Sequence, residues 1–267
     1  MVSSRTADPD EAPRLDTSVA HRARVWDWWL GGKDNFHVDR VAGARVKEIF
    51  PEVVAVARAD REFLARVVRF LVDAGVRQFL DIGTGLPRAD NTHSLAQRHA
   101  PESRVVYVDN DPLVLVHARA LLTGGPEGAI DYIDADVRNP DRILHAAQAT
   151  LNFSEPVGVL MLGVLNFVLD DTEAHRVVHG LMNAVSSGSY LAVTHPTHEL
   201  GGDANREAMK YWNAHATPPI RTRGGNEIRR LIDDLTILDP GLVSCARWRN
   251  DADAPSVPQY AAVCRKP

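Results

Sequence analysis

A short apolar segment that ends in an acid and two glycines constrains the fold of this chain most. Residues 78–82 are predicted to form a buried strand, which runs directly into Gly83-Thr84-Gly85. A helix is expected over residues 88–100, and a strand, a glycine turn and a helix in this order bring backbone N–H groups to a ligand. Asp81 lies two residues before the first glycine, where it would repel a phosphate but not a cationic or hydroxyl-bearing cofactor.

Beyond Gly75, strand and helix patterns alternate, which predicts βαβ units, an α/β fold and a mostly parallel sheet with helices on both faces. The expected strands cover residues 78–82, 104–109, 129–134, 157–164 and 189–195. The expected helices cover residues 88–100, 111–122, 140–151 and 171–186. Two polar helices, over 201–215 and 225–234, precede two strands over 242–249 and 259–265, which would add an antiparallel edge and give seven strands.

The N-terminal part of the chain differs from the rest. Residues 1–16 are polar and are expected to be a disordered tail, with neither the basic start nor the apolar stretch of a signal peptide. Residues 17–75 show apolar positions at helical spacing and predict a helical cap. Residues 76–267 then form the predicted ligand-binding domain.

Four polar or glycine signals follow successive predicted strands, at the sheet edge where open α/β sheets bind ligands. Each alone is weak, because glycines end many strands and acids cap many helices. Their order on successive strands is more specific. A carboxylate after the second strand can accept both ribose hydroxyls, and one after the third can accept from an adenine amino group. The signals are the turn with Asp81, Gly83 and Gly85, then Asp109 with Asn110, then Asp136 with Val137, and last Gly163.

With these motifs the chain resembles class I S-adenosylmethionine-dependent methyltransferases, and within them an actinobacterial family once known only as a domain of unknown function. The resemblance implies a Rossmann-like fold and S-adenosylmethionine as the cofactor. It implies that Asp81, Gly83 and Gly85 face the methionine portion, that Asp109 and Asn110 hold the ribose, and that Asp136 and Val137 hold the adenine. The most family-specific block is Gly31-Gly32-Lys33-Asp34-Asn35-Phe36.

Two parts of the chain leave the binding mode open. Leu86-Pro87 stands where many methyltransferases have a further glycine, and proline offers no N–H to a ligand. The loop after Gly31 could close over the cofactor, with Lys33 or Asn35 near the methionine carboxylate. The alternative is that the aromatic residues of this block only pack the helical cap onto the sheet.

Catalytic residues are harder to predict from the sequence than cofactor-binding residues. The cofactor carries the activated methyl group, and the protein mainly aligns the acceptor. If the acceptor must lose a proton, the candidate bases near strand ends are His93, His195 and His198, each of which could equally be a cap or surface residue. No catalytic residue is assigned. Asp170 and Asp171 are expected to cap the helix that follows them rather than to bind a metal.

The composition of the chain disfavours some classes of binding partner. The net charge of −5 gives no electrostatic case for nucleic acid or an acidic membrane, and the fourth strand lacks the Pro-Pro-aromatic segment typical of nucleic-acid base methylation. A small-molecule acceptor is therefore expected. Cys245 and Cys264 predict free, partly buried thiols and no zinc site, and no apolar run reaches the length of a membrane span, so a cytoplasmic protein is expected. Alternatives are a non-catalytic cofactor-binding sensor and an NAD-dependent oxidoreductase, although Arg88 breaks the dinucleotide glycine motif.

Overall fold

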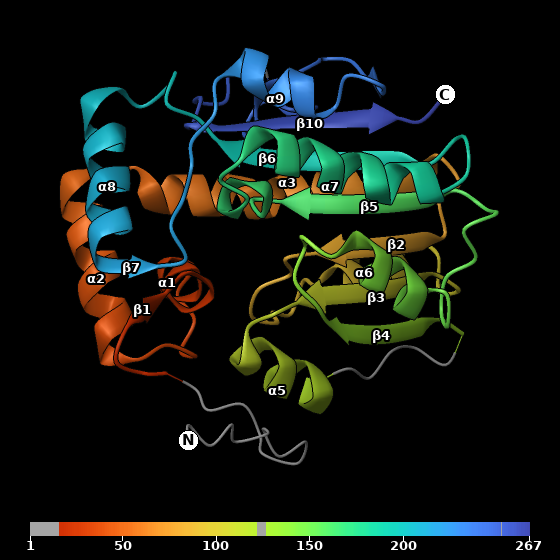
Figure 1. Cartoon of the computed structure of the whole chain (residues 1–267), viewed down its shortest axis with the longest axis horizontal. Coiled ribbons are helices and arrows are strands. Elements are labelled where there is room, and N and C mark those ends of the chain that lie inside the picture. The colour runs from red at the N-terminus through yellow and green to blue at the C-terminus, as the bar shows by residue number, and fades with distance from the viewer. Residues whose placement is uncertain (1–15, 122–126, 252) are drawn as a thin grey trace, which may run out of the picture.

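The protein is described by a computed structural model, which covers residues 16–121, 127–251 and 253–267. The predicted tail therefore lies almost wholly outside the described residues. Within them, the centre is an eight-stranded sheet in the order β4-β3-β2-β5-β6-β10-β8, with the short β9 pairing with the other part of β10 (Figure 1). The strands are β2 (Gln78–Ile82), β3 (Arg104–Asp109), β4 (Ala129–Asp134), β5 (Val157–Leu162), β6 (Tyr190–Pro196), β8 (Thr236–Ile237), β9 (Val243–Ser244) and β10 (Gln259–Arg265).

The five strands from β4 to β6 are mutually parallel, and β10 runs antiparallel to β6. This confirms the predicted fold class, a Rossmann-like α/β sheet with an antiparallel C-terminal strand. The predicted number of seven strands is wrong, because β8 adds an eighth strand to the sheet in the described residues. The order reverses at β2, where the chain first goes to β3 and β4 on one side and later to β5 and β6 on the other. Ligands of open α/β sheets bind beside such a reversal, at the carboxyl ends of the strands.

Alternate residues of each strand enter two separate cores, because successive side chains point to opposite faces of a sheet. Phe79, Val105 and Leu160 pack on one face against the helices α3 (Val53–Asp73) and α4 (Thr92–Gln97). Leu80 and Val106 pack on the other face with α6 (Pro140–Ala147), α7 (Asp171–Ala184) and α9 (Gly225–Leu231). The helix α5 (Pro112–Leu121) lies beside the edge strand β4 (Figure 1). The result is three layers with the sheet in the middle.

The N-terminal segment extends the first core beyond the carboxyl ends of the parallel strands (Figure 1). Its helices α1 (Arg22–Trp29) and α2 (His37–Ile49) pack on each other, and α2 packs on α8 (Gly202–His215). The two-residue strands β1 (Ala20–His21) and β7 (Ala216–Thr217) pair in parallel and join the two segments. The division into a cap over 17–75 and a domain over 76–267 stays a prediction, and residues of both contribute to one core.

Local structure departs from the predictions at several element ends. The helices predicted over 140–151 and 225–234, for example, end at Ala147 and Leu231. The first helix after the glycine turn begins at Thr92 rather than at residue 88, because Arg88 donates its backbone N–H to Asn91 Oδ1 (2.8 Å) in a separate turn. The predicted strand over 242–249 is only the two residues of β9. Both cysteines are free and fully buried. In the described residues we find no helix that is both long and apolar enough to cross a membrane.

Candidate functional site: a cavity at the carboxyl ends of the parallel strands

A cavity lies between the carboxyl ends of β2, β3, β4 and β5 and the helices α1 and α3. Seven of the ten residues proposed from sequence line it: Asp81, Gly83, Gly85, Asp109, Asn110, Asp136 and Val137. The other three, Lys33, Asn35 and Gly163, do not lie on its wall. The remainder of the wall comes from residues that the motifs did not single out, among them Arg22, Asp27, Asp60, Arg61 and Arg88.

Asp81 ends β2 and is a buried carboxyl group on the cavity wall. Its Oδ2 atom accepts a hydrogen bond from the Thr92 hydroxyl at 2.6 Å, so the shortened helix α4 supplies a partner at its first residue. Burial raises the pKa of Asp81 to about 6, because a charged carboxylate loses hydration there. A cationic ligand group beside Asp81 would stabilise the ionised form.

Asp109 is the last residue of β3, and its carboxylate connects this strand to the glycine turn after β2. Its Oδ2 atom accepts from the Gly85 N–H at 2.9 Å, and its Oδ1 atom accepts from the N–H groups of Asn110 and Asp111. The Gly83 N–H donates to the Val108 carbonyl instead. The glycine N–H groups are thus already paired within the protein, which corrects the expectation that they donate to a ligand. Gly85 has a φ of +65°, and no atom lies within 4 Å of the place that a Cβ would take, so the turn leaves open space at that point.

Asp136, after β4, is held by two neighbours at the other end of the cavity. Its carboxylate accepts from the Asn110 amide (3.2 Å) and pairs with the Arg138 guanidinium (3.0 Å). Arg138 also donates to the Phe167 carbonyl, which links this end of the cavity to the loop after β5. Asp136 is 38% exposed, so its carboxylate remains accessible to a ligand.

The Gly-Gly-Lys-Asp-Asn segment surrounds Asp27 of α1 rather than the cavity itself. Asp27 Oδ2 accepts from the Asp34 N–H (3.0 Å) and from the Asn35 amide (3.1 Å). A Cβ at Gly32 would lie 1.8 Å from Asp27 Oδ1, so only glycine fits there. The Arg88 guanidinium donates to the same Oδ1 atom at 3.2 Å. Asn35 therefore positions Asp27, which holds Arg88 on the cavity wall, and Lys33 is exposed.

Arg22, the first residue of α1, is the cation whose role sequence reasoning missed. Its guanidinium lies 4.3 Å from the centre of the Phe167 ring, and no hydrogen bond or ion pair reaches it from the described residues. Burial lowers the pKa of Arg22 to about 10, so it stays protonated at neutral pH. By contrast Arg61 donates to Asp90 (3.0 Å) and Arg88 to Asp27. Arg22 is thus a cation available to a ligand anion.

Gly163 provides the space that Arg22 occupies. It has a φ of +55°, and a Cβ there would lie 2.8 Å from Arg22 Nη2. Glycine is needed at this position for a close approach, as the sequence suggests, but the group that approaches is a protein side chain. No local sequence pattern could reveal Arg22, because residues 22 and 163 meet only in the folded chain.

Comparison with known proteins gives this cavity its context. The model of the S-adenosyl methyltransferase family matches residues 8–267. The chain belongs to this family. A DUF574 family protein from Streptomyces avermitilis is similar in structure, with 39% identity over 95% of this chain and 100% of that one, and a TM-score of 0.91. A Thermobifida fusca protein assigned to the methyltransferases has 37% identity over 97% of this chain and 99% of that one, and a TM-score of 0.85.

More distant structures share the fold alone. The pyocyanin biosynthetic protein PhzM has 15% identity over 80% of this chain and 57% of that one, with a TM-score of 0.51. Among curated proteins, none matches the chain. Membership of the S-adenosyl methyltransferase family makes the protein an S-adenosylmethionine-dependent enzyme.

The residues on the cavity wall fit S-adenosylmethionine, which carries a sulfonium, an amino group, a carboxylate, a ribose diol and an adenine. Asp81 and Asp109 offer carboxylate oxygens to the positive and hydroxyl groups, and Arg22 offers a cation to the carboxylate. The open space beside Gly85 lets a ligand approach the turn. A dinucleotide fits less well, because the Gly83 and Gly85 N–H groups that would bind its pyrophosphate donate within the protein.

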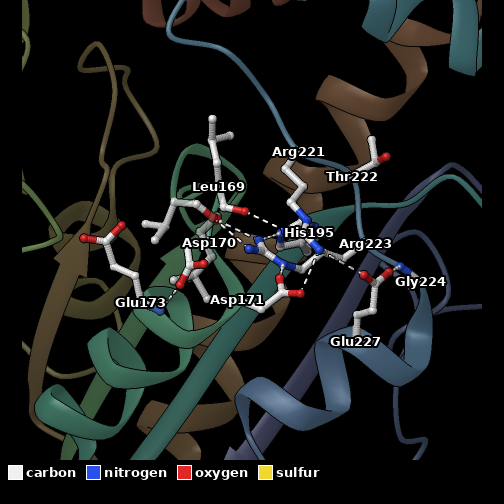
Figure 2. Close-up of polar contacts among 12 residues, drawn as sticks. Leu169, Asp170, Asp171, Glu173, His195, Arg221, Thr222, Arg223, Gly224 and Glu227 are labelled. Atoms are coloured by element: carbon white, nitrogen blue, oxygen red, sulfur yellow. Dashed lines mark hydrogen bonds and ion pairs between the residues drawn. The ribbon is translucent and has the colours of Figure 1, made fainter.

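His195 of this methyltransferase is fully buried and serves the fold, which corrects its candidacy as a base. Figure 2 shows it beside Arg223, whose Nη1 donates to His195 Nε2 at 2.9 Å, while His195 Nδ1 lies 2.9 Å from the Pro196 carbonyl. Burial, with some help from the nearby arginines, lowers the pKa of His195 to about 3. Its one lone pair is occupied, so it cannot take a proton from an acceptor.

The same network holds the loop after β5. The buried Arg223 donates to the carbonyls of Leu165 (3.0 Å) and Val168 (2.7 Å) and to Asp171 Oδ1 (2.8 Å), as Figure 2 shows in part. Leu165 belongs to the 3-10 helix η1 (Leu165–Phe167). Asp170 caps α7 by accepting from the Glu173 N–H at 2.8 Å, as predicted. These acids therefore have structural partners.

The two other candidate histidines also lie off the cavity wall. His93 Nδ1 lies 2.8 Å from the Tyr107 hydroxyl, and His198 lies 3.5 Å from the Thr222 hydroxyl. The histidine on the wall is His21, whose Nδ1 atom lies 2.8 Å from Asp111 Oδ2. Sequence reasoning missed it because it lies in the N-terminal segment, outside every strand-end motif.

Proposed function

We propose that this methyltransferase transfers the methyl group of S-adenosylmethionine to a small-molecule acceptor. The observation that carries the proposal is Arg22, a protonated guanidinium without an ion-pair partner among the described residues, on the wall of a cavity otherwise rich in carboxylates. A ligand that carries both a carboxylate and positive groups would pair with Arg22 and with the carboxylates of that wall.

Each part of the cofactor has a proposed partner in this cavity. Arg22 binds the methionine carboxylate, and Asp81 receives the amino group beside the turn of Gly83 and Gly85. Asp109, with Asn110, accepts the ribose hydroxyls through lone pairs that the backbone N–H groups leave free. Asp136 accepts from the adenine amino group, next to the Val137 N–H.

The cofactor supplies a methyl group on a positively charged sulfur, which is a good leaving group. Arg22, Asp81 and Asp109 would hold the cofactor so that a lone pair of the acceptor can reach this methyl group. The chain's part is to orient the two reactants and to exclude water. The helices α1 and α3 cover the cavity, which supports an acceptor small enough to enter beneath them.

The proposal is tested with S-adenosylmethionine labelled in its methyl group and an actinobacterial cell extract split into small molecules, protein and nucleic acid. We expect the label in the small-molecule fraction, and at least tenfold less transfer by the Asp109→Ala variant when the cofactor is below saturation. Label in protein or nucleic acid would contradict the acceptor class. Cofactor binding without transfer to any fraction would favour a sensor.

A further inference from the structure

A second, smaller cavity adjoins the cofactor cavity, and Arg22 and Trp26 line both. It lies between α1, α3 and α8 and the segment after β5. Its place next to Arg22 puts it beside the proposed methionine end of the cofactor, where a methyl acceptor must lie. This inference therefore rests on the proposed function for its role, although the cavity itself does not.

The wall of this second cavity is almost entirely apolar. Trp29 and Trp212 supply flat ring surfaces, and Phe50, Met209 and Ile220 supply further apolar surface. Both indole N–H groups are already used, by the Gly43 carbonyl (3.2 Å) and by the Pro218 carbonyl (2.9 Å). The two tryptophans thus offer the cavity no hydrogen-bond donor, and an apolar occupant is favoured.

Besides the Arg22 guanidinium, one polar atom among the described residues of this wall lacks a partner. Asn166 is 2% exposed, and its Oδ1 atom forms no hydrogen bond within the part of the chain that the structure describes. The other two amides on the wall are engaged, since Asn205 donates to the Thr197 carbonyl (2.8 Å) and Gln259 donates to Asp60 (3.1 Å). A buried acceptor without a donor loses its hydration and gains nothing in return, so an unpaired oxygen on a cavity wall favours a ligand that supplies the donor.

The backbone around Asn166 is held rigidly. Its carbonyl accepts from the Arg221 N–H at 2.9 Å. The carbonyls on either side, of Leu165 and Val168, accept from the buried Arg223 guanidinium. The arginine network of Figure 2 therefore fixes the loop that carries Asn166. A fixed backbone places the unpaired oxygen in advance, which is how a binding site gains specificity.

We propose that the second cavity binds the methyl acceptor, and that this acceptor is a flat apolar molecule whose single O–H or N–H group donates to Asn166 Oδ1. The hydrogen bond orients the acceptor's heteroatom toward the cofactor cavity at Arg22 and Trp26. The flat indole rings of the wall favour a planar acceptor, and Asn166 Oδ1 favours an acceptor with an O–H or N–H group.

Three probes of nearly equal shape test the proposal without knowledge of the natural substrate: para-cresol, para-toluidine and para-xylene. Binding is measured by quenching of tryptophan fluorescence, because Trp29 and Trp212 line the cavity. We expect the two donor-bearing probes to bind about tenfold more tightly than para-xylene, the factor that corresponds to one net hydrogen bond. The Asn166→Leu variant should bind all three equally. Equal binding of the three by the native protein would overturn the proposal.

A second variant tests the location. Met209→Trp fills the cavity from α8 and should weaken all three probes at least tenfold, whereas Lys210→Trp, the matched control at an exposed position of the same helix, should bind them as the native protein does. Unchanged probe binding by Met209→Trp would also overturn the proposal. S-adenosylhomocysteine affinity is measured in parallel by calorimetry. If it fails to bind while the probes behave as expected, the proposed function and the cavity's role for a methyl acceptor both fall, and only a site for a flat, donor-bearing ligand stands. The reverse result rejects only the cavity.

Discussion

Replacement of Asp81 by asparagine should stabilise the fold and weaken cofactor binding in the same variant. The folded protein raises the pKa of this carboxyl from 3.8 to about 6, chiefly by burial. A shift of about 2 units at about 1.4 kcal/mol per unit corresponds to roughly 3 kcal/mol of destabilisation when the group is ionised. Asparagine keeps an oxygen for the Thr92 hydroxyl and removes the charge.

The sign of the pH dependence follows from the raised pKa. Below about pH 4 the carboxyl is protonated in both the folded and unfolded states, so the native protein and Asp81→Asn should be equally stable. As pH rises toward about 6 the unfolded state ionises first, and the native protein loses stability relative to the variant. Above about pH 6 the difference is constant.

The assay is thermal unfolding across this pH range without cofactor, with Asp134→Asn, an exposed carboxyl on β4, two strands away, as the matched control. At neutral pH we expect the melting temperature of Asp81→Asn to rise by up to roughly 6–12 °C, at about 2–4 °C per kcal/mol for a chain of this size. Saturating S-adenosylmethionine should raise the melting temperature of the native protein but not of the variant. A variant that is no more stable than the native protein at about pH 8 would refute the reasoning.

Four further variants test other parts of the site. Arg22→Gln should weaken S-adenosylhomocysteine binding about tenfold or more by calorimetry, since a charge-assisted hydrogen bond is lost, and unchanged affinity would remove Arg22 from the cofactor site. In denaturant unfolding, Asn166→Leu should be as stable as the native protein or more so, whereas Asn205→Leu should lose about 1–3 kcal/mol because its amide has partners; equal effects would show that Asn166 is not unpaired. Arg223→Met should cost about 3–5 kcal/mol, because it leaves the Leu165 and Val168 carbonyls without donors, and a neutral result would contradict the structural role of the Figure 2 network.

The strands of the sheet were predictable because their signal is local. Runs such as Gln78–Ile82 and Arg104–Asp109 are apolar, end in or beside acids and are separated by helical patterns, and the structure has them at the predicted bounds. The bounds of α4 were not predictable, because its start depends on a turn closed by Asn91 and on the Arg61 contacts from α3. Asn91 lies only three residues from Arg88, but Arg61, which also donates to Asn91 Oδ1, lies thirty residues away in the chain.

The same distinction separates the two halves of the cofactor site. Asp81, Asp109 and Asp136 lie at strand ends, so the order of strands alone brings them to one edge of the sheet. The wall that α1 supplies depends instead on tertiary packing, such as the contact of Arg22 with the space at Gly163. Of the residues that the sequence pointed to, Asn35 is linked to this wall. It does not line the cavity itself, but its side-chain amide donates to Asp27, which does.

The central claim is that the cavity at the carboxyl ends of β2, β3 and β4 binds S-adenosylmethionine. Calorimetric titration of S-adenosylhomocysteine into the native protein, Asp109→Ala and Asp134→Ala tests it most directly, because these two acids face each other on neighbouring strands and only Asp109 lines the cavity. We predict saturable one-to-one binding to the native protein and to Asp134→Ala, and at least a tenfold loss of affinity for Asp109→Ala. Equal affinity of all three proteins, or no binding to the native protein, would contradict it.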